Sequence, residues 1–160
     1  MHSSKAGLSV ADEKKYIGIL FFFFAVQIMS WVPRFPEVKA NLGLSNGEFG
    51  TYLSFGSIGA VIAMLSSGHL VHKFGAKSVL IISTFSLCVA ISTIVHLQSA
   101  PIFIIVNIIN GASVSAFNTA LNAQAFHAQD RAGELILSRQ HGFWTMGAVT
   151  TAILSGFMVE

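Results

Sequence analysis

Four long stretches without lysine, arginine, aspartate or glutamate constrain the fold of this chain more than any other feature. They cover residues 16–32, 49–71, 78–129 and 142–159. A membrane-spanning helix needs about 20 mainly apolar residues, because the hydrocarbon core of a bilayer is about 30 Å thick. The third stretch is long enough for two spans. The sequence therefore predicts an all-α integral membrane chain with about five transmembrane helices. The predicted spans cover residues 16–33, 48–71, 78–97, 101–126 and 141–159.

The composition excludes an ordinary soluble domain. The chain is 53% hydrophobic and 10% charged, whereas soluble domains carry about a quarter charged residues. The net charge of +2 comes from loops that flank the predicted spans, so membrane lipid is an expected partner and nucleic acid is not. The single Cys88 rules out a disulfide framework or a cysteine-based zinc site within the chain.

Basic residues fix the predicted orientation, because cytoplasmic loops carry an excess of lysine and arginine. With a cytoplasmic tail over residues 1–15, only Arg34 and Lys39 face outward. We therefore predict a multi-pass membrane protein with its N-terminus in the cytoplasm, and a retained first span rather than a cleaved signal peptide. The inward-facing basic residues are Lys5, Lys14, Lys15, Lys73, Lys77, Arg131 and Arg139.

The first span carries polar side chains near its outer end. Gln27, Ser30 and Trp31 are three and four residues apart, so they share one helix face. Arg34 lies about 27 Å along the helix from Tyr16, near the outer edge of the hydrocarbon core. Two interpretations of Arg34 stay open: an interfacial arginine that extends to water, or an arginine at the outer mouth of a pathway that meets anionic ligands.

The fourth span is the most polar. Gly111, Ser115, Asn118 and Asn122 follow one another at steps of four, three and four residues, which forms one stripe. An amide facing lipid would leave its hydrogen-bonding groups unmet, so the stripe faces protein or water. It serves either hydrogen bonding between helices or the lining of a route for a neutral polar solute. We favour the lining.

Other residues predict local structure. Pro33 and Pro36 predict a kink at the outer end of the first span. Ser45 and Glu48 have capping-box spacing and predict the start of the second span. Small residues at four-residue steps predict faces where helices approach closely. These are Gly59, Ala63 and Ser67 in the second span and Gly147, Thr151 and Ser155 in the fifth.

The turn after the second span has a recognisable spacing. It reads Gly68, three residues, His72-Lys73, one residue, Gly75, one residue and Lys77. This pattern resembles the loop between helices two and three of the major facilitator superfamily, in which aspartate and arginine stand at the positions of His72 and Lys73. Two other stretches resemble a bacterial branch near the fucose permease. They are residues 31–45, which begin Trp-Val-Pro-Arg, and residues 121–142, which begin Leu-Asn-Ala-Gln and end with His-Gly.

The resemblance implies that this chain is the incomplete N-terminal half of a twelve-helix secondary transporter, and that the remaining helices are its partner. In the family, helices one and four line a central cavity and the two halves rock in alternating access. The hairpin residues above then form a cytoplasmic gate, where His72 cannot supply the family's carboxylate. The implied substrate pathway contains Gln27, Trp31, Arg34, Ser115, Asn118 and Asn122.

The sequence thus predicts transport of a small polar solute, with this chain as a fragment. The alternative is a structural or assembly membrane subunit without a pathway of its own. A membrane enzyme is disfavoured, since His69 and His72 lack a third nearby metal ligand and no phosphate-binding glycine loop is present. We predict no cofactor and no metal site.

Overall fold

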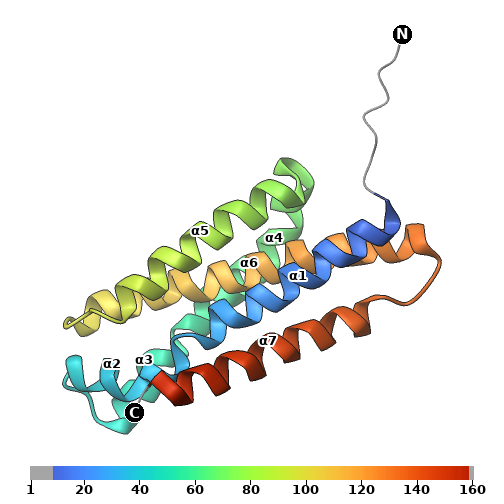
Figure 1. Cartoon of the computed structure of the whole chain (residues 1–160). Coiled ribbons are helices and arrows are strands. Elements are labelled where there is room, and N and C mark those ends of the chain that lie inside the picture. Colours follow the sequence, from blue (N-terminus) through green and yellow to red (C-terminus); the bar gives the residue numbers. More distant parts are fainter. Residues whose placement is uncertain (1–8, 159–160) are drawn as a thin grey trace.

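Helices form the whole of the regular structure in residues 9–158, which are the residues that the computed structural model describes (Figure 1). The helices run roughly side by side, with the short α2 and α3 at one end. The elements are α1 (Val10–Met29), the 3₁₀ helix η1 (Val32–Arg34), α2 (Phe35–Asn41), α3 (Asn46–Ser54), α4 (Gly56–Phe74), α5 (Ala76–Ile94), α6 (Ala100–Ala132) and α7 (Leu137–Met158).

Four segments of the described chain are long and apolar enough to cross a membrane. They confirm an all-α membrane fold. Helix α7 is not among them: it has 22 residues, but its first turns carry Arg139, Gln140 and His141. A crossing by α7 stays a prediction. The four segments are Val10–Asn41, Asn46–Phe74, Ala76–Ile94 and Ala100–Ala132.

Helix α1 begins earlier than the predicted span. Residues 1–15 were predicted to be a tail, but residues 10–15 are helical, and residues 1–8 lie outside the described part. The Ser9 side chain accepts a hydrogen bond from the Asp12 backbone N–H at 3.1 Å, which caps the helix. Asp12 and Glu13 then place negative charge in the first turn, where the helix dipole favours it.

The outer end of the first span is kinked, as its prolines predict. Helix α1 ends at Met29, and the chain continues through η1 into α2, with Pro33 and Pro36 in the first turns of these two elements. Proline has no N–H and clashes with the preceding turn, so a continuous helix is disfavoured here.

The second span begins at the predicted capping box and then breaks. The Ser45 side chain accepts from the Glu48 N–H, and the Glu48 carboxylate accepts from the Ser45 N–H. The helix is interrupted at Phe55, between α3 and α4. The Asn107 amide of α6 donates to the Leu53 carbonyl at 2.9 Å and the Tyr52 carbonyl at 3.2 Å, which satisfies the carbonyls at this break.

Glycines set the closest approaches between helices. A Cβ on Gly59 would overlap the Ile108 carbonyl oxygen of α6, and a Cβ on Gly111 would overlap the Gly56 carbonyl oxygen of α4. Gly59, Ala63 and Ser67 are buried, so the predicted packing face of α4 is confirmed. The predicted face of α7 is confirmed in the same way, because its Gly147 lies against the Phe22 carbonyl of α1.

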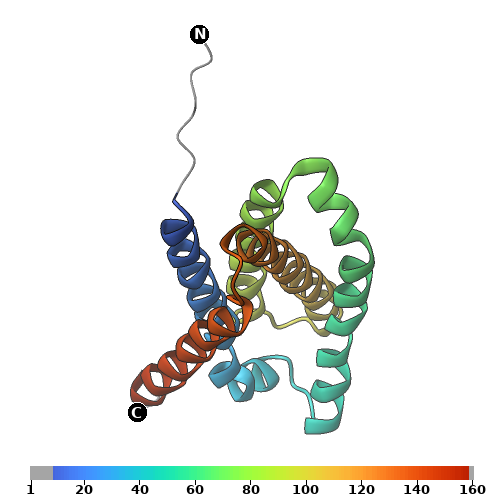
Figure 2. The same cartoon turned by 90° about the vertical axis from the view of Figure 1, so that its right-hand side faces the viewer.

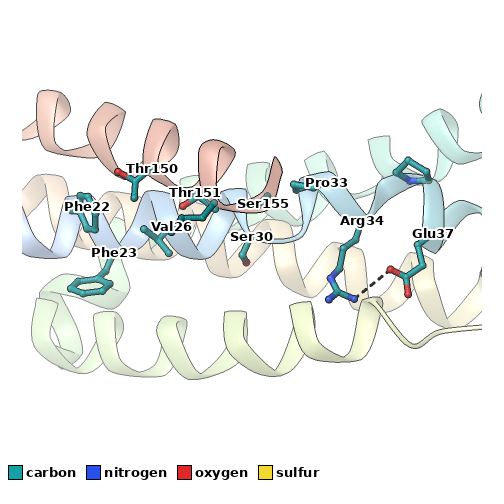
Figure 3. Close-up of a pocket in the computed structure, with 12 residues that line it drawn as sticks. Phe22, Phe23, Val26, Ser30, Pro33, Arg34, Glu37, Thr150, Thr151 and Ser155 are labelled. Carbon is teal, nitrogen blue, oxygen red and sulfur yellow. Dashed lines mark hydrogen bonds and ion pairs between the residues drawn. The ribbon is translucent and has the colours of Figure 1, made fainter. Parts of the chain in front are cut away.

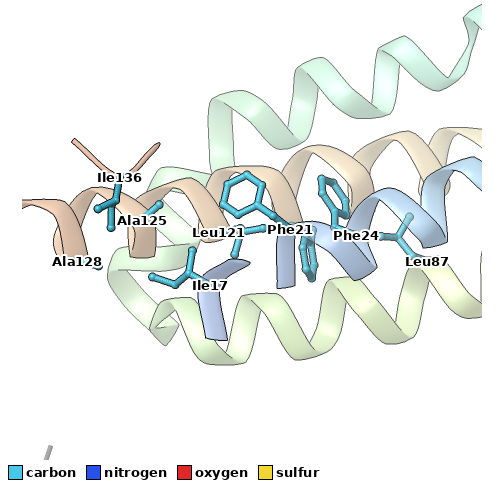
Figure 4. Close-up of a cluster of buried hydrophobic side chains, with 9 residues drawn as sticks. Ile17, Phe21, Phe24, Leu87, Leu121, Ala125, Ala128 and Ile136 are labelled. Atoms are coloured by element: carbon cyan, nitrogen blue, oxygen red, sulfur yellow. The ribbon is translucent and has the colours of Figure 1, made fainter. Parts of the chain in front are cut away.

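Buried hydrophobic clusters lie along the bundle, and two of them are large. One joins α1, α5 and α6 with the start of α7 (Figure 4). In it the rings of Phe24 and Phe117 stack with centroids 4.4 Å apart. The other lies at the outer end and contains Trp31, Val38, Leu42, Phe49, Ile94 and Phe103. Helix α6 packs against α1, α4 and α5 and is the common support of the bundle (Figure 2).

Polar contacts tie the start of α1 to the turn between α6 and α7. Glu13 pairs with Arg131, and Lys14 pairs with Glu134. We call these two ion pairs the ionic clasp. The Gln140 amide adds a hydrogen bond to the Lys14 carbonyl at 3.1 Å. Because one partner in each pair is well exposed, each pair contributes at most about 1 kcal/mol.

Reversing one charge of the clasp should have a small, salt-dependent effect. We expect Glu13→Arg to lower the free energy of unfolding by about 1 kcal/mol or less, because it places two cations together. The double variant Glu13→Arg/Arg131→Glu should restore it. Thermal unfolding in detergent at low and high salt measures both, and a double variant as unstable as the single one would contradict the pairing.

Candidate functional site

A groove opens between α1, α6 and α7, with a cavity volume of about 460 Å³. We call it the central groove. One wall is aromatic and aliphatic and comes from α1. The other walls carry polar groups from α6 and α7. The lining residues are Phe21, Phe24, Ile28, Val114, Ser115, Asn118, His141 and Trp144.

Two residues of the predicted stripe lie directly in the central groove. Ser115 is half-buried and Asn118 is exposed there. One turn further on, the Asn122 amide donates to the Asn118 backbone carbonyl at 2.9 Å and to its side-chain oxygen at 3.0 Å. Asn122 therefore orients the Asn118 carboxamide, and in the described residues the Asn118 amide nitrogen donates no hydrogen bond.

The α7 wall was not predicted. His141 packs edge to face against Phe21, with ring centroids 5.2 Å apart, and Trp144 lies one turn later in the same groove. The spacing of three residues puts both rings on one face of α7. The sequence shows this spacing, but it does not show which helix packs against this face of α7.

The structure places two predicted residues, Gln27 of α1 and Trp31 just before η1, away from the central groove. The Gln27 amide donates to Cys88 Sγ at 3.1 Å and to the Thr84 carbonyl at 3.3 Å, both on α5. Trp31 is 7% exposed in the outer cluster and packs against Phe35, with ring centroids 4.6 Å apart. The six predicted pathway residues therefore do not share one surface.

Arg34 lies at an outer cleft of about 730 Å³ between α1, α2 and α7 (Figure 3). Hydroxyl groups of Ser30, Thr150 and Thr151 line the same cleft. Arg34 Nη1 lies 3.4 Å from Glu37 Oε2, and both side chains are more than half exposed. Such a pair is weak, so it leaves the guanidinium accessible to anions in water. Both interpretations of Arg34 remain open.

The hairpin between α4 and α5 is a single residue. Gly75 joins the helices with φ 80° and ψ 147°, a conformation that residues with a Cβ rarely adopt. His72 and Lys73 end α4 and Lys77 opens α5, and all three are exposed. Lys73 Nζ lies 5.2 Å from the centroid of the Phe74 ring. In residues 9–158 no three His, Cys, Asp or Glu side chains gather as a metal site would require.

Comparison with known proteins identifies one family. The model of the Major Facilitator Superfamily matches residues 17–160. No solved structure matches the chain.

Three curated relatives are similar to the chain. An uncharacterized MFS-type transporter of Yersinia pestis is 27% identical over 84% of this chain and 35% of its own length. An uncharacterized transporter of Sinorhizobium fredii is 24% identical over 82% of this chain and 35% of its own. The membrane protein MosC of Rhizobium meliloti is 25% identical over 89% of this chain and 34% of its own. The chain thus spans about a third of the length of these relatives.

Proposed function

The chain belongs to the major facilitator superfamily, and from this premise we propose that it supplies the first five helices of a secondary transporter that moves a small polar solute by alternating access. Two of the three relatives are named as transporters. In transporters of this kind, solute sites lie between helices near the middle of the bilayer.

The central groove is the observation that carries the proposal. Its polar groups are a hydroxyl, a carboxamide and an imidazole, opposite the aromatic rings of α1. Lysine, arginine, aspartate and glutamate do not occur among its lining residues. This lining suits a neutral solute with several hydroxyl or amide groups. Polar atoms of the solute that give up hydrogen bonds with water can form new ones with the polar side chains of the groove.

We assign the predicted pathway residues different roles. Ser115 and Asn118 contact the solute, and Asn122 orients Asn118. Gln27 and Trp31 hold α1 in place against α5 and the outer cluster. Arg34 stands at the outer mouth. The remaining helices of the transporter would supply the opposite wall of the groove, since the relatives are about three times as long as the matched region.

We further propose a bacterial inner membrane location with the N-terminus in the cytoplasm. The distribution of basic residues supports it: seven of the nine lie on one side under this orientation. The hairpin residues Gly68, His72, Lys73, Gly75 and Lys77 then face the cytoplasm as an inner gate.

We expect His72→Ala to alter the transport rate and its dependence on pH in the complete transporter. His72 occupies the gate position at which the family pattern has aspartate, and an imidazole cannot supply the carboxylate of that pattern. Uptake into cells at several pH values measures both effects. The gate role fails if neither the rate nor its pH profile changes.

Water access to the central groove tests the proposed function. In a Cys88→Ser background, Asn118→Cys should react with a membrane-impermeant maleimide at least about tenfold faster than Ile105→Cys, because thiols react as hydrated thiolates. Ile105 is 59% exposed on the same helix but lines none of the grooves described above, so it is the matched control. The measurement would use the complete transporter reconstituted in lipid nanodiscs, because its remaining helices supply the opposite wall of the groove.

Equal protection of both cysteines would favour the alternative, a structural or assembly membrane subunit. A specific observation supports that alternative: the amides of Gln27 and Asn122 are occupied by bonds within the bundle. Their polar character alone therefore does not require an aqueous route. The accessible Asn118 makes transport the better-supported function.

A further inference from the structure

A second groove lies between α4 and α5, with α6 as its floor and a volume of about 500 Å³. It exists because α4 and α5 each pack more extensively on α6 than on one another. We call it the hairpin groove. Its lining is apolar apart from a few serines, and its rim is formed by well-exposed side chains. The rim residues include Ile62, Phe74 and Ile82, which are 60%, 56% and 67% exposed.

The length of the hairpin groove matches one leaflet of a bilayer. Its lining runs along α4 from Ile62 to Phe74, which corresponds to about 18 Å at the rise of an α-helix. Half of the hydrocarbon core measures about 15 Å. Both helices belong to segments that are apolar enough to cross the membrane, so the groove opens to lipid and not to water.

The end of the hairpin groove nearest Gly75 is flanked by two exposed lysines, Lys73 and Lys77. Lys73 directly precedes Phe74, which lines the groove, and Lys77 lies two residues before the lining residue Val79. Residues 49–129 contain no aspartate or glutamate. In the described part of the chain, Lys14, Arg34 and Arg131 each pair with a carboxylate, whereas Lys73 and Lys77 form no ion pair.

We propose that the hairpin groove binds one anionic phospholipid, with an acyl chain between α4 and α5 and its phosphate at Lys73 and Lys77. When the acyl chain enters the groove, it exchanges its contacts with neighbouring lipids for contacts with the apolar lining. The two lysines add attraction for a headgroup with net negative charge, as basic residues near a membrane surface do. With the predicted orientation, the lipid belongs to the cytoplasmic leaflet.

Native mass spectrometry of the detergent-solubilised chain tests this site with two defined lipids. After incubation with equal amounts of palmitoyl-oleoyl phosphatidylglycerol and phosphatidylcholine, we expect one retained lipid per chain and a preference of about tenfold or more for phosphatidylglycerol. Lys73→Gln/Lys77→Gln should remove that preference, since each lysine contributes about fivefold in affinity. Equal retention of both lipids by the unmodified chain would overturn the proposal.

Two matched controls locate the bound lipid. Ser66→Phe places a large ring in the hairpin groove and should abolish retention, whereas Ser57→Phe lies on an exposed part of α4 outside it and should not. Lys15→Gln removes another exposed lysine and should leave the headgroup preference unchanged. The proposal fails if Ser66→Phe retains lipid as the unmodified chain does, or if Lys15→Gln is as effective as the hairpin variant. Circular dichroism confirms that each variant is helical.

Discussion

Gly59→Leu is expected to lower the free energy of unfolding by about 3 kcal/mol or more. A Cβ at this position would overlap the Ile108 carbonyl oxygen and lie 3.0 Å from the Ala112 nitrogen. Both are backbone atoms of α6, so no side chain can rotate away and the helices must separate. Overpacking usually costs about 1–3 kcal/mol, and a clash with backbone belongs at the upper end. Thermal unfolding of the purified chain in detergent measures the loss.

Gly68→Leu is the matched control for Gly59→Leu. Gly68 lies on the same helix, and a Cβ there would meet no atom within 4 Å. Leucine also favours the helix more than glycine does, by about 0.5–1 kcal/mol. We therefore expect Gly68→Leu to be neutral or slightly stabilising. Similar melting temperatures for the two variants would show that α4 and α6 do not meet through Gly59.

Asn107→Leu should destabilise the chain by about 1–2 kcal/mol. Leucine has the same branched arrangement of heavy atoms as asparagine, but it cannot donate to the carbonyls of Tyr52 and Leu53. Those carbonyls lie where the helix is interrupted between α3 and α4, and no water in the bilayer core replaces a lost partner. Hydrogen bonds between membrane helices are worth up to about 1.7 kcal/mol each. Chemical unfolding in mixed micelles would report the difference.

Asn110→Leu provides the comparison, because Asn110 is buried one turn away on α6 and its side-chain oxygen has no hydrogen-bond partner. Removing a buried polar atom without a partner costs little and can stabilise. We expect Asn110→Leu to be near neutral. If it were as harmful as Asn107→Leu, the loss would come from packing volume and not from the bonds at the helix break.

Sequence patterns predicted the features that depend on neighbours along the chain. The Ser45–Glu48 capping box needs residues three apart, and the kink follows from the missing N–H groups of Pro33 and Pro36. The small-residue face through Gly59 also has a fixed helical period. In each case the physical cause lies within one or two turns, so one sequence suffices to identify it.

Features that depend on contacts between helices were missed. Neither proline nor an inserted charge marks the interruption at Phe55, and its stabilising amide comes from Asn107 on another helix. The pattern around Trp31 identified a face but not the outer cluster that covers it. His141 and Trp144 could be assigned to one face of α7, but only the packing of α7 on α1 turns that face toward Asn118.

The two helices α6 and α7, which form walls of the central groove, are supported to unequal extents by the rest of the bundle. The α6 wall is braced by α1, α4 and α5, whereas the α7 wall packs chiefly on α1. Helices α7 and α1 approach closely at the contact between Gly147 and the Phe22 carbonyl, and α7 can pivot at this contact. A tilt of α7 about this point would move the two ends of α7 relative to α1 while the contact between α4 and α6 stays intact. In the proposed transport, the α7 wall would then adapt to the bulk of the solute, and the α6 wall would hold Ser115 and Asn118 in place.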